Sequence, residues 1–491
     1  MSSTSNASGS AGNQRNSDPE NPLLLPSRKG FSARDEIARV FFRGGSSFDA
    51  WLTACTAQVA QVLLTLPYSF AQMGMVPGIL FQLVYGLLGC WSCYMTTSLY
   101  ADYVRILDRQ NSRRDDHIIQ WYEVLGGLLG KGWKMAGLAS NCILLLCTAT
   151  IQLIACGSTV WYINDSFEKR TWTYIFGAGC FLTVFVPTAR NYRLWAFVGI
   201  FMTTYTAWFM TISAVIHGKV SVQSSSSSLP SSVIDLQVEN VEHSGAKSSV
   251  QYFTGGTNIL YAFGGHAVTL EIMDAMHKPR SFKIVYLCAV LYIFTLTIPS
   301  AASVYWRFGD AMLHNPNALA VFPRTRFRDA AVVLMLAHQF IEFGVLALPI
   351  FVMWEKLLGV HHSKKHYIVK SLSRIPIVLV IWFIAIMIPF FGPINSVVGA
   401  LLASVAVYIL PCVAFMYARQ APESRKGALE QPPCWLLRSW VPMYCINLGS
   451  VLWVAIVGVG FGGWASVSNL MEKISSFGFF ARCYQCNSTR H

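Results

Sequence analysis

Long apolar runs recur along almost the whole chain, and they constrain its fold more than any other feature. A run of roughly 20 mainly apolar residues is long enough to cross the hydrocarbon core of a bilayer. The sequence therefore predicts an all-α polytopic membrane protein with eleven transmembrane helices. The predicted spans are Trp51–Phe70, Pro77–Tyr100, Met135–Ile163, Thr173–Pro187, Leu194–Ile216, Tyr252–Met273, Ile284–Trp306, Ala330–Trp354, Ile375–Phe391, Ile394–Tyr417 and Tyr444–Trp464.

The composition agrees with a chain that lies mostly in lipid. Only 12% of the 491 residues are charged and 54% are hydrophobic, whereas about a quarter of a soluble domain is charged. Too few charges remain to cover the roughly three soluble domains that this length would otherwise suggest. Most of the 13 cysteines lie inside apolar runs, where they act as small hydrophobic residues and not as a disulfide framework.

The segments between the apolar runs divide the chain into predicted regions. The N-terminal region is rich in Ser, Asn and Gly and has no apolar stretch of signal-peptide length. A Ser-rich loop separates two halves of five spans each. The regions are a disordered cytoplasmic tail (1–48), a ten-helix core (49–417, with repeats 49–217 and 252–417), a cytoplasmic loop with the eleventh helix (418–464) and an extracellular tail (465–491).

Lysine and arginine residues fall mainly on one side of the predicted spans. If the N-terminus is cytoplasmic, 26 of the 37 lie on the cytoplasmic side and 11 on the other. We therefore expect a cytoplasmic N-terminus and an extracellular C-terminus. This bias explains most of the net charge of +13 without a nucleic-acid partner. The glycosylation sequons at Asn164 and Asn487 both fall on the predicted outer side.

Motifs of soluble enzymes are absent from the sequence. It contains no HExxH, no GxSxG, no P-loop and no strand–GxGxxG–helix pattern. Cys483 and Cys486 lie in the predicted outer tail, where oxidation to a disulfide is permitted. Zinc would need two more ligands, and none has suitable spacing. We expect a protein that is not an enzyme and that binds no metal and no organic cofactor.

Helix-breaking residues interrupt the first and sixth spans. Pro67 removes one backbone hydrogen bond and clashes with the carbonyl group four residues earlier. Gly255–Gly256 and Gly264–Gly265 weaken the sixth span. Two interrupted helices five spans apart are typical of inverted-repeat transporters, which hold substrate at the breaks near the bilayer midplane. Two tolerated kinks in ordinary helices remain the alternative.

Polar side chains gather on the same two spans. Helical spacing places each set on one face, so we predict that both line a substrate site. Hydrogen bonds between helices are the alternative role for these residues. The first set is Gln58, Gln61 and Thr65, and the second is Thr254, Thr257, Asn258 and Tyr261.

Ionisable residues at membrane depth are candidates for proton coupling. His266 follows the second glycine pair, and His338 and Glu342 are spaced i,i+4 in the eighth span. Histidine, with an unperturbed pKa near ~6.5, can take up a proton from an acidic exterior and release it to a neutral cytosol. A purely structural histidine is the alternative. Glu271 lies nearer the cytoplasmic end, where we expect a solvated role as readily as a coupling role.

Long and specific motifs occur in segments that include Gln58–Phe70, Tyr85–Gly89, Thr257–Met273, Thr295–Trp306 and Ile388–Leu402. Through these motifs, residues 44–486 resemble the plant auxin influx carriers of the amino acid/auxin permease family. The resemblance implies a LeuT-like 5+5 inverted repeat with broken helices 1 and 6, and proton-driven uptake of indole-3-acetic acid at the plasma membrane. It also implies that His266 binds substrate and couples protons. Ala57 and Glu342 depart from the family pattern.

The sequence thus predicts a proton-coupled auxin symporter whose partners are indole-3-acetic acid and related auxins, protons and the lipid membrane. We expect the substrate carboxylate to lie at a half-helix N-terminus. A proton-coupled amino acid permease on the same fold, or a membrane receptor or channel without coupled transport, are the alternatives. The predicted substrate-binding residues are Gln58, Gln61, Thr65, Tyr68, Asn258, Tyr261 and His266.

Overall fold

Helices make up the described part of the chain, in which the computed structural model contains no strand. The structure describes residues 45–59, 61–110, 118–186, 193–216, 241–264, 268–360, 367–436, 438–482 and 484. Residues 44–491 form a single unit, and the predicted tail 1–48 lies almost wholly outside the described residues. The eleven cysteines in the described ranges are free thiols, and Cys483 and Cys486 lie outside these ranges.

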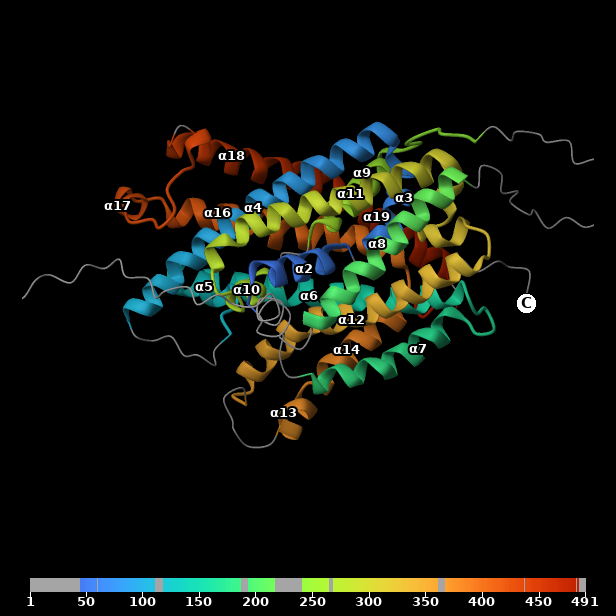
Figure 1. Cartoon of the computed structure of the whole chain (residues 1–491), viewed down its shortest axis with the longest axis horizontal. Helices are drawn as coiled ribbons and strands as arrows, with labels where there is room; N and C mark the ends of the chain where they lie inside the picture. The colour runs from blue at the N-terminus through green and yellow to red at the C-terminus, as the bar shows by residue number, and fades with distance from the viewer. Residues whose placement is uncertain are drawn as a thin grey trace, which may run out of the picture. The chain divides into compact units, whose positions relative to one another are not determined.

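Eight helical runs are long and apolar enough to cross a membrane, and they correspond to eight of the predicted spans. Figure 1 shows most of these helices running along the long axis of the view. The eight runs are formed by α4 (Met75–Arg109), α6 (Lys131–Trp161), α8 (Arg193–Ile216), α11 (Phe282–Phe308), α12 (Arg326–Leu357), α13–α14 (Tyr367–Ser373, Ile375–Met387), α15–η7–α16 (Phe391–Val397, Val398–Ile409, Leu410–Ala418) and α18–η9–α19 (Trp440–Trp453, Val454–Gly462, Gly463–Phe477).

The other three predicted spans are interrupted or short. The first is the bent pair α2 (Ser47–Val59) and α3 (Val62–Met73), which together are long enough to make a ninth span. The fourth is α7 with the 3₁₀ turn η1, and the sixth is α9 followed by α10. The bounds are Lys169–Cys180 (α7), Phe181–Phe185 (η1), Ser249–Ala262 (α9) and Thr269–Asp274 (α10). The count of eleven spans stays a prediction.

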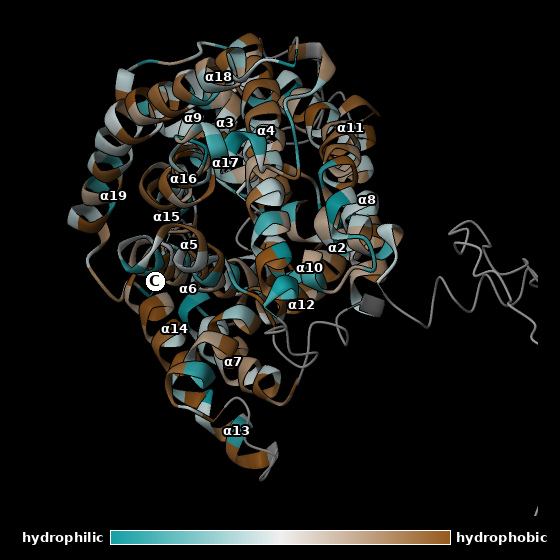
Figure 2. Ribbon diagram, turned by 90° about the vertical axis from the view of Figure 1, so that its left-hand side faces the viewer, coloured by the Kyte–Doolittle hydropathy of each residue, from teal (hydrophilic) through white to brown (hydrophobic). Residues whose placement is uncertain are grey.

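The outer helices expose large apolar side chains, as a surface in contact with lipid requires. Leu80 and Leu87 of α4 are 54% and 58% exposed, and Phe201 of α8 is 65% exposed. A soluble monomer rarely exposes contiguous apolar patches of such extent. Hydrophobic colour predominates on α11, α14 and α18 in Figure 2. The molecule is a multi-pass membrane protein.

Segments predicted to share one side of the membrane do lie together. The backbone N–H of Arg170 donates to the carbonyl of Arg482 (3.3 Å), which joins the α6–α7 turn region to the segment after α19. At the other end, the N–H of His277 donates to the carbonyl of Gly45 (2.9 Å). The short helices α5 (Trp121–Leu129), α10 and α17 (Pro422–Lys426) lie at this second end, on the left of Figure 1.

Two expectations about where helices are interrupted are wrong. Pro67 lies inside α3, and the bend of 48° lies before this helix, between α2 and α3. Gly255–Gly256 lie within α9 and do not interrupt it. The helix that contains the last predicted span continues beyond Trp464 to Phe477. Its extension packs Gly463, Ala465 and Ser466 into the protein, which offsets its low hydropathy.

Candidate functional site

The two interrupted spans pack against each other along α3 and α9. All twelve residues of α3 are buried, as are the last nine residues of α9. A membrane-depth break frees backbone groups that only protein or a water-filled cavity can satisfy. The junction of α2–α3 with α9–α10 is therefore where polar chemistry is expected.

Two side-chain hydrogen bonds join α3 to α9. The Nε2 of Gln61, at the N-cap of α3, donates to the hydroxyl of Tyr261 (3.2 Å), and the Nδ2 of Asn258 donates to the Oγ of Ser69 (2.6 Å). All four side chains are buried. Asn258 and Tyr261 therefore face the same neighbour, as their spacing of three residues predicted.

Glycines allow the backbones around α9 to approach closely. A Cβ at Gly255 would lie 2.8 Å from the Cγ of Met73 and 3.0 Å from the carbonyl oxygen of Ser69. A Cβ at Gly399, in the π-helical segment η7, would lie 2.4 Å from the carbonyl oxygen of Thr257. These contacts fix α9 between α3 and η7. π-helical segments are frequent at functional sites, because they displace side chains from regular helical positions.

Three polar side chains between positions 338 and 342 of helix α12 are fully buried. His338, Gln339 and Glu342 are each 0% exposed. None of their side-chain nitrogen or oxygen atoms has a hydrogen-bond partner within the described ranges. Burial of an unpaired polar or ionisable group is costly, so such groups mark functional sites in membrane proteins.

His338 and Glu342 point toward the junction of the broken spans. The imidazole Cδ2 of His338 and the side chain of Thr56 both pack on Gly199 of α8, within 3.2 Å and 2.8 Å of a Cβ placed there. His338 therefore lies beside the last turn of α2. Glu342, one turn further along α12, is close enough to Tyr261 for its charge to act on the phenol.

We call Gln61, Thr148, Tyr261, His338 and Glu342 the central polar cluster. Thr148 of α6 is an electrostatic neighbour of the Tyr261 phenol, and its hydroxyl donates to the carbonyl of Leu144 (2.8 Å). The cluster thus collects side chains from α6, α9, α12 and the start of α3 near the junction of the two broken spans. It offers hydrogen-bond donors, acceptors and two ionisable groups in a region closed to bulk water, and so it can bind a polar solute or hold a proton.

The other predicted residues of the first span, Gln58, Thr65 and Tyr68, are not part of the central polar cluster. Gln58 is buried but faces Tyr286 of α11. The expectation that Gln58 and Gln61 share a helix face is wrong, because the chain breaks between them. Thr65 is buried and donates to the carbonyl of Val62 (3.1 Å). Tyr68 lies further along α3, with its ring 3.7 Å from a Cβ placed at Gly392.

In the sixth span, Thr257 turns away from α3 and bonds to the hydroxyl of Ser466 in α19 (2.9 Å). Thr254 is buried, and its hydroxyl has no partner within the described ranges. His266 lies outside the described residues, as does Asn487. Asn164 is exposed in the turn after α6, where a glycan could be attached.

Sequence reasoning missed two further unpaired amides near the same helices. Gln339 lies between His338 and Glu342 in the sequence, and Asn395 is fully buried in α15 with no hydrogen-bond partner in the described structure. A polar residue flanked by apolar neighbours in a membrane span was the available signal in both. No group of three or more potential metal ligands occurs among the residues that the structure describes.

Comparison with known proteins places this arrangement in a class of membrane transporters. Residues 43–457 match the family of transmembrane amino acid transporter proteins, and the chain belongs to this family. Within it, the chain is 51% identical to auxin transporter-like protein 3 of Arabidopsis thaliana over 476 residues, which cover 97% of each chain.

Other relatives carry similar names. Auxin transporter-like protein 1 of Medicago truncatula is 53% identical over 93% of this chain and 91% of its own. Auxin transporter protein 1 of Arabidopsis thaliana is 52% identical over 93% of this chain and 90% of its own. The expected resemblance to auxin carriers is therefore confirmed.

Proposed function

We propose that this chain is an auxin influx carrier, which imports indole-3-acetic acid across the plasma membrane together with protons. The observation that carries the proposal is the pair of buried, unpaired groups His338 and Glu342 beside the two broken spans. The identity of more than 50% to relatives named auxin transporters supports auxin as the substrate. The protein changes the position of its substrate and performs no reaction on it.

The carboxylate of auxin is proposed to lie at the N-terminus of α3. This helix begins at Val62, next to the bend, and its first backbone N–H groups carry the positive end of the helix dipole. Gln61 and Tyr261 stand at this helix start and can hydrogen-bond the carboxylate oxygens. Indole-3-methanol, which has a similar shape but no charge, should then compete poorly for uptake.

Protons are proposed to travel with the anion on His266, His338 and Glu342. An anion that enters a negative-inside cell climbs roughly 2.3 kcal/mol for each 100 mV. One proton cancels this charge, and two protons make the cycle carry one positive charge inward. Because the chain offers three candidate proton carriers, we expect an electrogenic cycle with at least two protons per anion.

Transport of an amino acid is the second candidate, since the matching family is that of amino acid transporters. A zwitterion also needs a partner for its ammonium group, and Glu342 could provide one. If Glu342 carries a proton instead, it is not an anionic partner for an ammonium group, and the site then favours auxin. The two candidates differ in whether uptake requires an ammonium group on the substrate.

Uptake of radiolabelled indole-3-acetic acid and of radiolabelled tryptophan, each with and without a proton ionophore, tests the proposal. We expect accumulation of the auxin at external pH 5.5 that the ionophore abolishes, and little accumulation of tryptophan. Preferential tryptophan uptake would establish the amino acid permease. Specific binding of auxin without uptake would establish a receptor.

The proposed topology places the N-terminus in the cytoplasm and the C-terminus outside. Asn164, exposed near the segment that ends the described chain, would then face the exterior. Asn164→Gln should remove a glycan, seen as a mobility shift that glycosidase treatment of the parent protein reproduces. A third sequon, Asn6-Ala7-Ser8, lies in the tail that is proposed to be cytoplasmic. A glycan attached at Asn6 instead would reverse the proposed orientation.

A further inference from the structure

A cavity of about 1080 Å³ opens between α4, the start of α11 and the chain segment 429–433. It lies away from the central polar cluster, at the end of the molecule that carries α10 and α17. Its walls change character along its length. One end is lined by Lys278, Arg280 and Lys283, and the other by apolar residues of α4 and α11.

The basic end of the cavity has an excess of positive charge. Lys283 pairs with Glu430 (2.8 Å) and lies 5.2 Å from the centre of the Tyr94 ring. Lys278 and Arg280 are exposed and have no ion-pair partner in the described structure. Three cations therefore face a single carboxylate, which leaves room for an anionic ligand.

The apolar end of the cavity is formed by side chains that are exposed on the surface expected to contact lipid. Leu87 of α4 is 58% exposed, and Ile284 and Leu287 of α11 are 60% and 40% exposed. They belong to two helices long and apolar enough to cross the membrane. A ligand here would meet hydrocarbon on one side and cations on the other.

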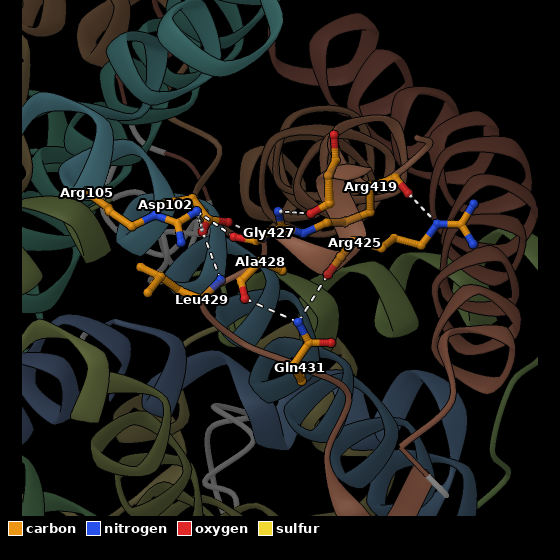
Figure 3. A network of polar contacts seen from close by, with 9 residues as sticks. Asp102, Arg105, Arg419, Arg425, Gly427, Ala428, Leu429 and Gln431 are labelled. Atoms are coloured by element: carbon orange, nitrogen blue, oxygen red, sulfur yellow. Dashed lines mark hydrogen bonds and ion pairs between the residues drawn. The ribbon is translucent and has the colours of Figure 1, made fainter. Parts of the chain in front are cut away.

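The wall at residues 429–433 is held rigidly by the network in Figure 3. Asp102 pairs with Arg419 and accepts a bond from the N–H of Leu429 (3.2 Å), and Arg105 donates to the carbonyl of Gly427 (2.6 Å). Gln431 bonds back to the carbonyl of Ala428 (3.2 Å). Hence the cavity is preformed and does not depend on a ligand to organise this wall.

We infer that this cavity binds an anionic phospholipid of the cytoplasmic leaflet. The phosphate of the headgroup would contact Lys278 and Arg280, and an acyl chain would lie along Leu87 and Ile284. Basic pockets between transmembrane helices on the cytoplasmic side are suited to phosphorylated headgroups. This inference rests on the proposed orientation of the chain but not on the transported substrate.

Native mass spectrometry of the purified full-length protein tests this inference. The probe is dioleoyl phosphatidylinositol 4-phosphate, with dioleoyl phosphatidylcholine as the neutral lipid. We expect the anionic lipid to be retained and the double variant Lys278→Gln/Arg280→Gln to lower its apparent affinity at least fivefold. Equal retention of the neutral lipid, or unchanged affinity of the double variant, would overturn the proposal.

The matched control is Lys131→Gln/Lys426→Gln, which removes two exposed lysines outside the cavity. It should leave lipid affinity unchanged, and an equal loss would mean that only net charge matters, against a specific site. Soluble inositol 1,4-bisphosphate should bind at least tenfold more weakly than the lipid. Equal binding would mean a free-phosphate site and would overturn the lipid assignment. Auxin uptake is measured separately, so failure of transport is distinguishable from failure of lipid binding.

Discussion

Buried charged residues in different parts of the described structure differ in whether they have a charged partner. Near the end that carries α17, Asp102 pairs with Arg419, and near α13 Glu355 pairs with Arg374 (2.6 Å). In the middle of α12, Glu342 is equally buried but has no hydrogen-bond partner in the described structure. These charged residues therefore differ in whether they have a partner and not in how deeply they are buried.

The paired groups hold structure together. Besides Glu355, the Arg374 guanidinium donates to the carbonyls of Val184 and Val186 (both 2.8 Å), so it ties η1 to the α12–α14 connection. A satisfied ion pair cannot exchange its partner without loss of these contacts. The unpaired groups of the central polar cluster are available to a proton or a substrate, at a cost in stability.

Removal of a paired charge should have the largest effect on folding. Arg374→Met removes the closer of the two ion pairs printed for the buried Glu355 carboxylate, which keeps its contact with Lys370 (3.2 Å). Loss of one member of a buried pair typically costs about 3–5 kcal/mol. We expect a sharp fall in the fraction of folded protein that survives heating in detergent, measured by fluorescence-detected size exclusion.

The double variant Arg374→Met/Glu355→Leu provides the control for this effect. Replacement of a buried ion pair by apolar residues is often neutral, so the double variant should recover much of the lost stability. If Arg374→Met were as stable as the parent protein, the distinction between paired and unpaired groups would not hold.

Removal of an unpaired charge should affect transport and not folding. Glu342→Gln keeps the shape of the side chain but cannot carry a proton at this position. We expect uptake of auxin to fall at least tenfold, equivalent to about 1.4 kcal/mol. Thermal stability should be equal or higher, because a neutral amide costs less to bury than an ionised carboxylate.

Glu472→Gln is the matched control, since its side chain is 68% exposed on α19. It should change neither uptake nor stability. Full uptake by Glu342→Gln with an unaltered pH dependence would move the proton role away from Glu342, with His266 and His338 as the remaining candidates.

The smallest expected effect concerns the hydrogen bond between the two broken spans. Gln61→Leu and Tyr261→Phe each remove one partner, and a neutral hydrogen bond contributes about 0.5–1.5 kcal/mol. We expect the KM for auxin to rise about threefold in each variant. If the two groups act together, the KM of the double variant should rise no more than about fivefold. A rise in KM equal to the product of the two single-variant rises would show that the groups act independently.

Much of the helical framework was predictable because each helix must satisfy the same hydrophobic requirement. The position of the first break was not, since the residues around Gln61 are ordinary helix formers and Pro67 was the more visible signal. The chain tolerates Pro67 within a helix that is buried along its entire length. The contact of Gly255 with α3 likewise depends on a neighbour that periodicity does not specify.

Part of the candidate site was predictable from helical spacing. Spacing placed Thr254, Thr257, Asn258 and Tyr261 on one face. The structure confirms this for Asn258 and Tyr261, which both bond to the first span, but Thr257 bonds to Ser466 of α19. The pairing of Glu355 with Arg374 could not be predicted, because it joins the last turns of α12 to the start of α14 through a tertiary contact that sequence spacing does not specify. Sequence indicates which residues are polar at membrane depth, but the tertiary fold decides which of them find partners.

The segment after α19 has a consequence for how the molecule is made. The carbonyl of Tyr484 accepts a bond from the Nζ of Lys169, 315 positions earlier, and the N–H of Phe480 donates to the carbonyl of Met387 (3.0 Å). The start of α7 is therefore synthesised long before its partner leaves the ribosome. A translation product that stopped after α18 would contain every residue of the central polar cluster but would lack the segment after α19 that bonds to Lys169 and Met387.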